Sequence, residues 1–433
     1  MAKFKQLPDG YLDKTPLLQF ILLSCLFPLW AAAASLNDIL ITQFKSVFTL
    51  SDFASALVQS AFYGGYFLIA IPASLIIKKT TYKFAILIGL IVYIIGCAMF
   101  YPASHMATYT MFLAAIFSIA IGLSFLETAA NTYSLMIGSK KFATLRLNIS
   151  QTFHPVGAIA GILLGKYLVF QEGASIEEQM AGMTAEQIHT FKLTLLEHTL
   201  QPYKYMIFIL IVIAILFLII QFPKCKVEPT EEQGKASSPT FMETIKYLAG
   251  HSTFKKGIFA QFLYVGLQVA VWSFTIRLAL SLSDMNERDA SNFMVYSFIA
   301  YFVGKLIANF LMTKFNGHLI LFLYSVLGTV ALAYTAFVQD FSAVYAAIIV
   351  SVFMGPCWAT IYGASIEVVE NKYREIAGAI VVMSIIGGAV VPAVHGFVSD
   401  QVGSLQTAFI VPMVCFVYIA YYFWYRFRNL NNK

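Results

Sequence analysis

The 433-residue sequence is poor in charge, and this scarcity excludes most soluble classes of protein. Only 12% of its residues are Asp, Glu, Lys or Arg, whereas 59% are hydrophobic, and the mean hydropathy is +0.75. A soluble domain carries roughly 25% charged residues, which it needs to cover its surface. We therefore expect a protein that folds in a lipid bilayer, with short loops and no large soluble domain.

Cysteine is also scarce, and the motifs of metal sites and hydrolases are missing. The five cysteines lie far apart, without metal-ligand spacing, and we expect them to be packing residues. No H-E-x-x-H, G-x-x-x-x-G-K-[ST], G-x-S-x-G or paired C-x-x-C motif occurs. We therefore expect neither an enzyme, nor a resident cofactor or metal, nor an ATP-driven pump. The net charge of +6 is attributed to basic residues on cytoplasmic loops of a membrane protein. It therefore does not indicate a nucleic-acid partner.

Twelve hydrophobic runs are long enough for membrane helices, each of which needs about 20 mostly apolar residues. Six lie on each side of a polar stretch rich in Pro, Gly, Ser and charge, which is typical of a linker. The prediction is an all-α protein with halves at residues 1–222 and 254–433, and a linker at 223–253 that contains a short amphipathic helix near Met242 to Leu248. The expected spans are 17–44, 53–77, 84–102, 107–137, 147–170, 203–222, 254–282, 291–313, 318–338, 342–369, 375–399 and 405–425.

The distribution of basic residues predicts the orientation in the membrane. Most of the 28 Lys and Arg residues fall on one side when the N-terminus is inside, so both termini are predicted to be cytoplasmic. The acidic, amphipathic stretch 172–198 is then an external loop. In corresponding places of the two halves, Arg146 precedes GAIAGILLG and Arg374 precedes GAIVVMSIIGGAVVP. Small residues let helices approach closely, so these paired runs are interpreted as elements that rock during transport.

Two acids fall inside apolar runs, where an ionisable group costs at least about 2.5 kcal/mol. Asp38 lies late in the first span, and Glu127 lies in the fourth. Neither has a basic residue within one turn of its own helix, so a nearby partner must come from another helix, from water or from a substrate. A carboxyl in such surroundings can load a proton on one side of the membrane and release it on the other. The alternative is a helix-end acid in contact with water, which applies to Asp38 more than to Glu127.

Amides and aromatic rings suggest a sugar site. Tyr264, Gln268 and Trp272 are spaced at i, i+4 and i+8 and share one helix face. A sugar stacks its apolar face on aromatic rings and needs amides for its hydroxyls, although both residue types also serve ordinary packing between helices. His154, before Pro155, is expected to be a hydrogen-bonded packing group. Further amides within the spans that could take part are Asn37, Asn131, Asn148, Gln151, Gln261 and Asn309.

Several long strings in chain order resemble the fucose permease group of the major facilitator superfamily, from about residue 17 to about residue 420. The strings are LNDIL, QSAFYGGYF, KKTTYK, LETAAN, RLNISQTF, QFLYVG and IIGG-x-V-x-P-x-x-GFVSD. The resemblance implies two six-helix bundles around a central cavity, alternating access, and a monomer in the bacterial inner membrane that imports a neutral sugar with a proton.

The resemblance also implies roles for individual residues. Asp38 and Glu127 match the acids that couple protons and recognise the sugar, and Gln151 matches the glutamine of the R-L-N-x-x-Q-T-F string. Asn37 and Asn131 flank these groups, and Tyr264, Gln268 and Trp272 match the aromatic and amide helix of the second half. The leading hypothesis is an L-fucose:proton symporter. Alternatives are a glucose or galactose symporter, a passive sugar facilitator and a non-transporting sugar sensor.

Overall fold

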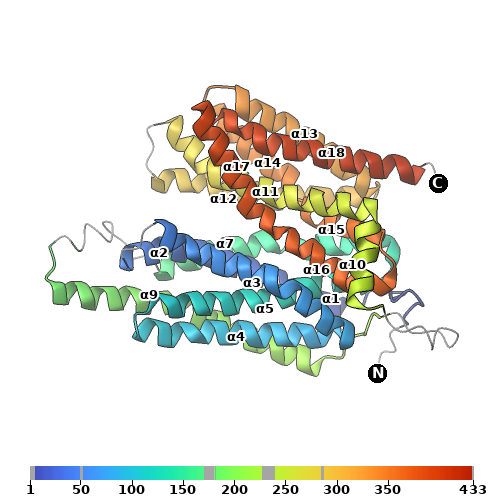
Figure 1. Ribbon diagram of the computed structural model, residues 1–433, viewed down its shortest axis with the longest axis horizontal. Helices are drawn as coiled ribbons and strands as arrows, with labels where there is room; N and C mark the ends of the chain where they lie inside the picture. The colour runs from blue at the N-terminus through green and yellow to red at the C-terminus, as the bar shows by residue number, and fades with distance from the viewer. Residues whose placement is uncertain are drawn as a thin grey trace. The chain divides into compact units, whose positions relative to one another are not determined.

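The computed structural model describes residues 5–48, 52–169, 180, 182–226, 239–283 and 287–431, and these residues are almost entirely helical (Figure 1). Twelve helical spans in this part of the chain are long and apolar enough to cross a membrane, which confirms the prediction of twelve transmembrane helices. The described residues form no β-strand, and their extended backbone pairs only in a single bridge between Gln6 and Leu12.

By compactness the chain divides into two units, which are described separately. Unit 1 comprises Met1–Pro16, Asn131–Pro155 and Cys225–Lys433, and unit 2 comprises Leu17–Ala130 and Val156–Lys224. These units follow local packing density rather than chain order, because the fourth and fifth spans each contribute to both. The division into halves at residues 223–253 stays a prediction.

Unit 2 contains most of the first six spans. Its helices pack through close contacts, such as the rings of Phe100 on α4 and Tyr203 on α9, which stack with their centroids 3.9 Å apart. The elements are α1 (Leu17–Ser24), α2 (Phe27–Val47), α3 (Asp52–Lys79), α4 (Tyr82–His105), α5 (Tyr109–Met136, up to Ala130), α7 (His154–Leu164, from Val156), the π-helical turn η2 (Gly165–Val169) and α9 (Ala185–Ile219).

Unit 1 contains the last six spans together with the end of α5 and the start of the fifth span. The helices that pack against each other in this unit include α13 with α18 and α11 with α17. The elements after α5 are η1 (Lys140–Phe142), α6 (Ala143–Gln151), α10 (Phe241–Gly250), α11 (Ser252–Ser281), α12 (Glu287–Met312), α13 (Gly317–Phe337), α14 (Ser342–Met354), α15 (Cys357–Glu367), η4 (Asn371–Tyr373), α16 (Arg374–Met383), η5 (Ser384–Ile386), α17 (Gly387–Val402), η6 (Thr407–Phe409) and α18 (Ile410–Asn431).

The paired runs of small residues occupy corresponding positions. In unit 2, α7 packs on α2, because Gly157 leaves room for the backbone of Pro28 where a side chain would collide. In unit 1, α17 packs on α11, because Gly387 leaves the same kind of room for the backbone of Phe262. The small residues therefore serve close helix packing in both places. Their rocking motion stays a prediction.

One predicted loop is partly helical. Residues 172–198 were expected to be an external loop, but α9 begins at Ala185 and continues into the sixth span. The cause is a capping box: the amide of Thr184 donates to the Gln187 side chain (2.9 Å), and the Gln187 amide donates to the Thr184 hydroxyl (3.4 Å). The loop prediction is wrong from Ala185 onward. The amphipathic helix predicted in the linker is confirmed as α10.

Candidate functional site

Glu127 lies within the apolar span of α5 and is only 5% exposed. The hydroxyl of Tyr66, on α3, donates a hydrogen bond to its carboxylate. The two helices can approach because Gly65 faces Ala120, where an added Cβ would lie 2.7 Å from the Ala120 side chain. A second bond fixes the same pair of helices, since the Ser124 hydroxyl donates to the Tyr66 carbonyl at 3.0 Å. The fold thus holds a carboxylate beside a neutral hydroxyl, away from water.

Asn37 and Asp38 lie next to each other on α2. Asn37 is 3% exposed, and neither polar atom of its amide has a hydrogen-bond partner among the described residues. A buried amide without partners costs free energy, so this side chain is suited to bind the hydroxyl of a ligand. The helix containing Asp38 is described, but its side chain lies outside the described part of the chain.

Asn131 and Gln151 are brought into direct contact in unit 1. The Gln151 amide donates to Asn131 Oδ1 at 3.1 Å, and both residues are buried. Around them, hydrogen bonds join the end of α5 and the start of the fifth span to helices of the second half. The Thr132 and Tyr362 hydroxyls lie 2.7 Å apart, Asn148 Nδ2 donates to Thr360 (3.0 Å), and Asn309 Nδ2 donates to Thr152 (2.7 Å).

Tyr264, Gln268 and Trp272 lie on one face of α11, as predicted. Each side chain makes a hydrogen bond to a neighbouring helix. Tyr264 donates to the Met354 carbonyl at 3.2 Å, and its hydroxyl lies 3.4 Å from that of Tyr301 on α12. Gln268 hydrogen-bonds the same Tyr301 hydroxyl. The Trp272 indole donates to the Ser351 hydroxyl at 3.2 Å. These residues form a buried row of rings and polar groups on α11, held by hydrogen bonds to neighbouring helices.

Lys305 on α12 is 1% exposed and was not among the predicted site residues. Its signal in the sequence is the string F-V-G-K-L-I-A-N-F, a single lysine among mostly apolar residues. The interpretation of His154 as a hydrogen-bonded packing group is wrong for one ring nitrogen. Its Nδ1 is buried and has no partner among the described residues.

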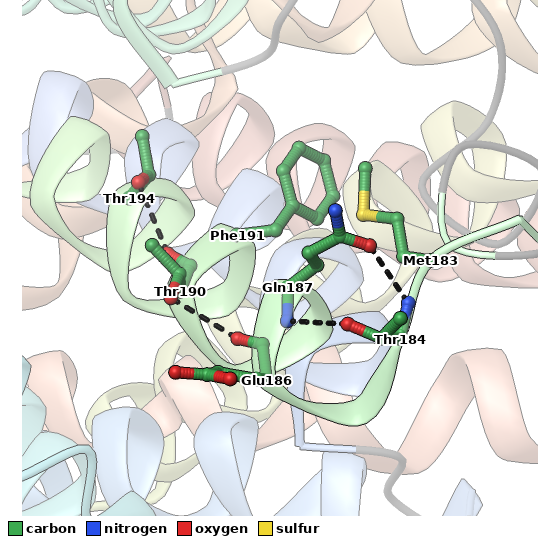
Figure 2. Close-up of a pocket in the computed structure, with 7 residues that line it drawn as sticks. All are labelled: Met183, Thr184, Glu186, Gln187, Thr190, Phe191 and Thr194. Atoms are coloured by element: carbon green, nitrogen blue, oxygen red, sulfur yellow. Dashed lines mark hydrogen bonds between the residues drawn. The ribbon is translucent and has the colours of Figure 1, made fainter.

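A surface pocket lies on the first turns of α9 (Figure 2). Its threonine hydroxyls are bonded within the helix, because Thr190 donates to the Glu186 carbonyl and Thr194 donates to the Thr190 carbonyl, both at 3.1 Å. None of the predicted site residues lines it. The pocket is therefore a feature of the helix surface and not a candidate substrate site. Its lining residues are Met183, Thr184, Glu186, Gln187, Thr190, Phe191 and Thr194.

Within the described residues, no cluster of His, Cys, Asp and Glu could hold a metal ion. The polar side chains lie buried on membrane-spanning helices, where they can bind a polar solute and a proton. The fold and these side chains define a helical membrane transporter. Residues 17–283 match the family model of the Major Facilitator Superfamily, and the chain belongs to this superfamily. It is a multi-pass protein of the bacterial inner membrane and not an enzyme.

Relatives with known names cover nearly the whole chain. The chain is 34% identical to the L-fucose-proton symporter of Escherichia coli (strain K12), over 98% of this chain and 96% of that protein. It is 32% identical to the L-fucose-proton symporter of Haemophilus influenzae, over 95% and 97% of the two chains. It is 29% identical to a glucose/galactose transporter of Brucella abortus, over 92% of each chain.

Solved structures agree with this assignment. The crystal structure of the E. coli fucose:proton symporter matches with a TM-score of 0.86 and 34% identity, over 94% of this chain and 98% of that one. The structure of a proton:xylose symporter matches with a TM-score of 0.67 but only 12% identity, which supports the fold alone.

Proposed function

We propose that this protein is a symporter that imports a neutral monosaccharide together with a proton by alternating access. The observation that carries the proposal is the burial of Glu127 within a membrane span, with its hydrogen bond from the neutral hydroxyl of Tyr66. A carboxylate there is costly, and protonation removes the charge. A proton bound together with the sugar stabilises the loaded carrier, so that it can reorient.

Sugar recognition is assigned to the buried amides and aromatic rings. Asn37 contributes donors and an acceptor without partners in the described chain, and Asn131 with Gln151 forms an amide pair. In the second half, Tyr264, Gln268 and Trp272 supply a stacking surface with hydroxyl and amide groups. Asp38 is the second carboxylate of the proposal, on the basis of its place in the LNDIL string.

L-fucose is the first substrate to test, because proteins of that name are 32–34% identical to this chain. Glucose and galactose follow, since transporters of that name are 27–29% identical. The proposal includes two six-helix bundles at residues 1–222 and 254–433, a cytoplasmic linker at 223–253, cytoplasmic termini and a monomeric carrier in the lipid bilayer.

The test measures pH in a weakly buffered suspension of energy-depleted cells that express the protein. L-fucose, D-galactose and D-glucose are added in turn. Alkalinisation of the medium with one sugar is expected, because a proton enters with it. Sugar uptake without alkalinisation would identify a passive facilitator instead.

A matched variant tests Glu127 itself. Glu127→Gln keeps the size and the hydrogen bond but cannot release a proton, so exchange of labelled sugar is expected to survive while uphill accumulation is lost. Uphill accumulation at the wild-type level in this variant would rule out the assignment of proton coupling to Glu127.

A further inference from the structure

A second polar row lies on α12, beside the row on α11. Tyr301, Lys305 and Asn309 are spaced at i, i+4 and i+8 and therefore share one face of the helix. Both ends of this row are fixed by hydrogen bonds to other helices. The Tyr301 hydroxyl lies 3.4 Å from that of Tyr264 on α11, and Asn309 Nδ2 donates to the Thr152 hydroxyl at 2.7 Å. The face that carries Lys305 is thus held rigidly.

Lys305 occupies the middle of this row and is 1% exposed. Its ammonium has no hydrogen-bond acceptor among the described residues, and it lies 4.7 Å from the centroid of the Tyr301 ring. Two other strongly buried cations differ in this respect. Arg146 donates to backbone carbonyls, among them that of Ser134, and Arg426 pairs with Glu367 at 2.7 Å. A buried ammonium without acceptors is destabilising, so this one requires a further explanation.

The backbone around Lys305 leaves it little freedom to move. At Gly304 a side chain would collide with the Val352 carbonyl, and at Gly355 a Cβ would lie 2.7 Å from the backbone nitrogen of Lys305. Helix α12 therefore packs directly on the junction of α14 and α15. The end of α12 at Met312 is about 10 Å away along the helix axis. Lys305 is thus fixed in the interior and does not reach the membrane surface.

Buried hydrogen-bond acceptors without donors lie near Lys305. Lys305 is within electrostatic range of His154 and of Cys357. The Cys357 thiol donates to the Phe353 carbonyl at 3.3 Å, whereas His154 Nδ1 and Asn309 Oδ1 are buried without partners among the described residues. Donors and acceptors without partners in one region are typical of a site that binds a polar ligand.

We propose that Lys305 binds the transported monosaccharide, with its ammonium donating hydrogen bonds to hydroxyl or ring oxygens of the sugar. A lysine offers three donors and no acceptor, so its ligand must present oxygen acceptors. This inference rests on the proposed function and deepens it, because it adds a charged sugar contact from the second half of the chain. A sugar carboxylate has the same acceptor chemistry, and the test separates the two.

The test compares Lys305→Met with a matched control, Lys314→Met. Lys314 also follows an aromatic residue by four positions, with its ammonium 4.8 Å from the centroid of the Phe310 ring, but it is exposed. Binding of L-fucose, D-galactose, D-glucose and D-galacturonate to the purified full-length protein is measured by calorimetry. Lys305→Met is expected to bind the wild-type sugar at least about tenfold more weakly, because a hydrogen bond from a charged donor is lost. Lys314→Met is expected to stay within about twofold of wild type.

Single-deoxy analogues of the bound sugar separate binding from a structural role. The wild type is expected to discriminate against the analogue that lacks the contacted oxygen, and Lys305→Met is expected to lose this discrimination alone. An equal loss of affinity for all analogues would indicate a structural role and overturn the proposal, as would unchanged affinity.

Two outcomes concern the ligand itself. Tight binding of D-galacturonate by the wild type, lost in Lys305→Met, would overturn the neutral-sugar assignment and identify a carboxylate as the group that Lys305 binds. If the wild type, with a normal thermal unfolding transition, binds none of these compounds, the proposed function fails and this inference fails with it. Binding by the wild type and an unaffected Lys305→Met would defeat this inference and leave the proposed function standing.

Discussion

The guanidinium of Arg374 lies over the ring of Tyr11, 5.2 Å from its centroid, although the two residues lie far apart in the sequence. The Lys140 ammonium approaches the same ring at 5.9 Å, and Asn371 Nδ2 donates to the Asp9 carbonyl at 3.1 Å. Tyr11 is 4% exposed. A turn at Pro8-Asp9-Gly10, with Gly10 at φ 84°, folds this segment back on itself. Residues 5–13 are therefore a packed part of unit 1.

This packing predicts that Tyr11→Ala destabilises the protein. Loss of a buried ring and of its contacts with two cations is expected to lower the free energy of unfolding by about 3 kcal/mol. Thermal unfolding of the purified protein in detergent measures the change. Tyr11→Phe retains the ring and is the control, with an expected loss below about 1 kcal/mol. Equal losses in both variants would show that the ring contacts are not what stabilises this segment.

Two adjacent glycines on α3 give a second, internally controlled prediction. An added Cβ at Gly65 would lie 2.7 Å from the Ala120 side chain, whereas at Gly64 it would meet nothing within 4 Å. Gly65→Ala is therefore expected to separate α3 from α5, weaken the Tyr66 bond to Glu127 and cost about 1–3 kcal/mol. Gly64→Ala is expected to be neutral or slightly stabilising.

Stability and uphill sugar accumulation are measured for both glycine variants. We expect accumulation to fall in Gly65→Ala alone, because only this variant disturbs the neighbours of Glu127. Wild-type accumulation in Gly65→Ala, or an equal defect in Gly64→Ala, would contradict the role of this close approach.

The third prediction concerns Cys225, which lies between α9 and α10 and is 1% exposed. Burial raises the pKa of its thiol to about 12, against a smaller opposing effect of Arg146. The native thiol is therefore expected to resist N-ethylmaleimide at pH 8, since the thiolate is the reactive form. Mass spectrometry of the native and denatured protein after labelling measures this. Complete labelling of native Cys225 within the time needed for the denatured chain would contradict the burial.

The raised pKa of the Cys225 thiol also makes the stability of the folded state fall as the pH rises. Between about pH 9 and 12 the unfolded chain releases the Cys225 proton while the folded chain keeps it. The folded state therefore loses stability as the pH rises through this range. Cys225→Ser, whose hydroxyl does not titrate there, is expected to lose less stability over the same range.

Local features of the sequence were predicted well where one physical effect dominates. The twelve spans follow from hydropathy, because about 20 mostly apolar residues in a row are what a helix needs to cross a bilayer. The common face of Tyr264, Gln268 and Trp272 follows from helical spacing alone. The start of α9 was not predicted, because residues 185–198 are polar, and a capping box at Thr184 nevertheless starts a helix there.

The ion-pair partners of charged side chains were predicted less well than the positions of the helices. Glu367 lies close to Lys372 and Arg374 in the sequence, but it pairs with Arg426 at 2.7 Å and with His318 at 3.4 Å. These partners belong to α18 and α13, so helix packing rather than sequence distance selects them. Lys372 pairs with Glu370 instead, at 3.0 Å.

The sequence alone determined that this protein spans a membrane with twelve helices, and that polar groups such as Glu127 must lie within them. Composition and helical period suffice for this, because both can be read within a single run of about 20 residues. Only the tertiary structure decided which groups meet: Glu127 with Tyr66, Asn131 with Gln151, and Lys305 with the ring of Tyr301. These contacts depend on where helices approach one another, and that is set by packing between residues far apart in the chain.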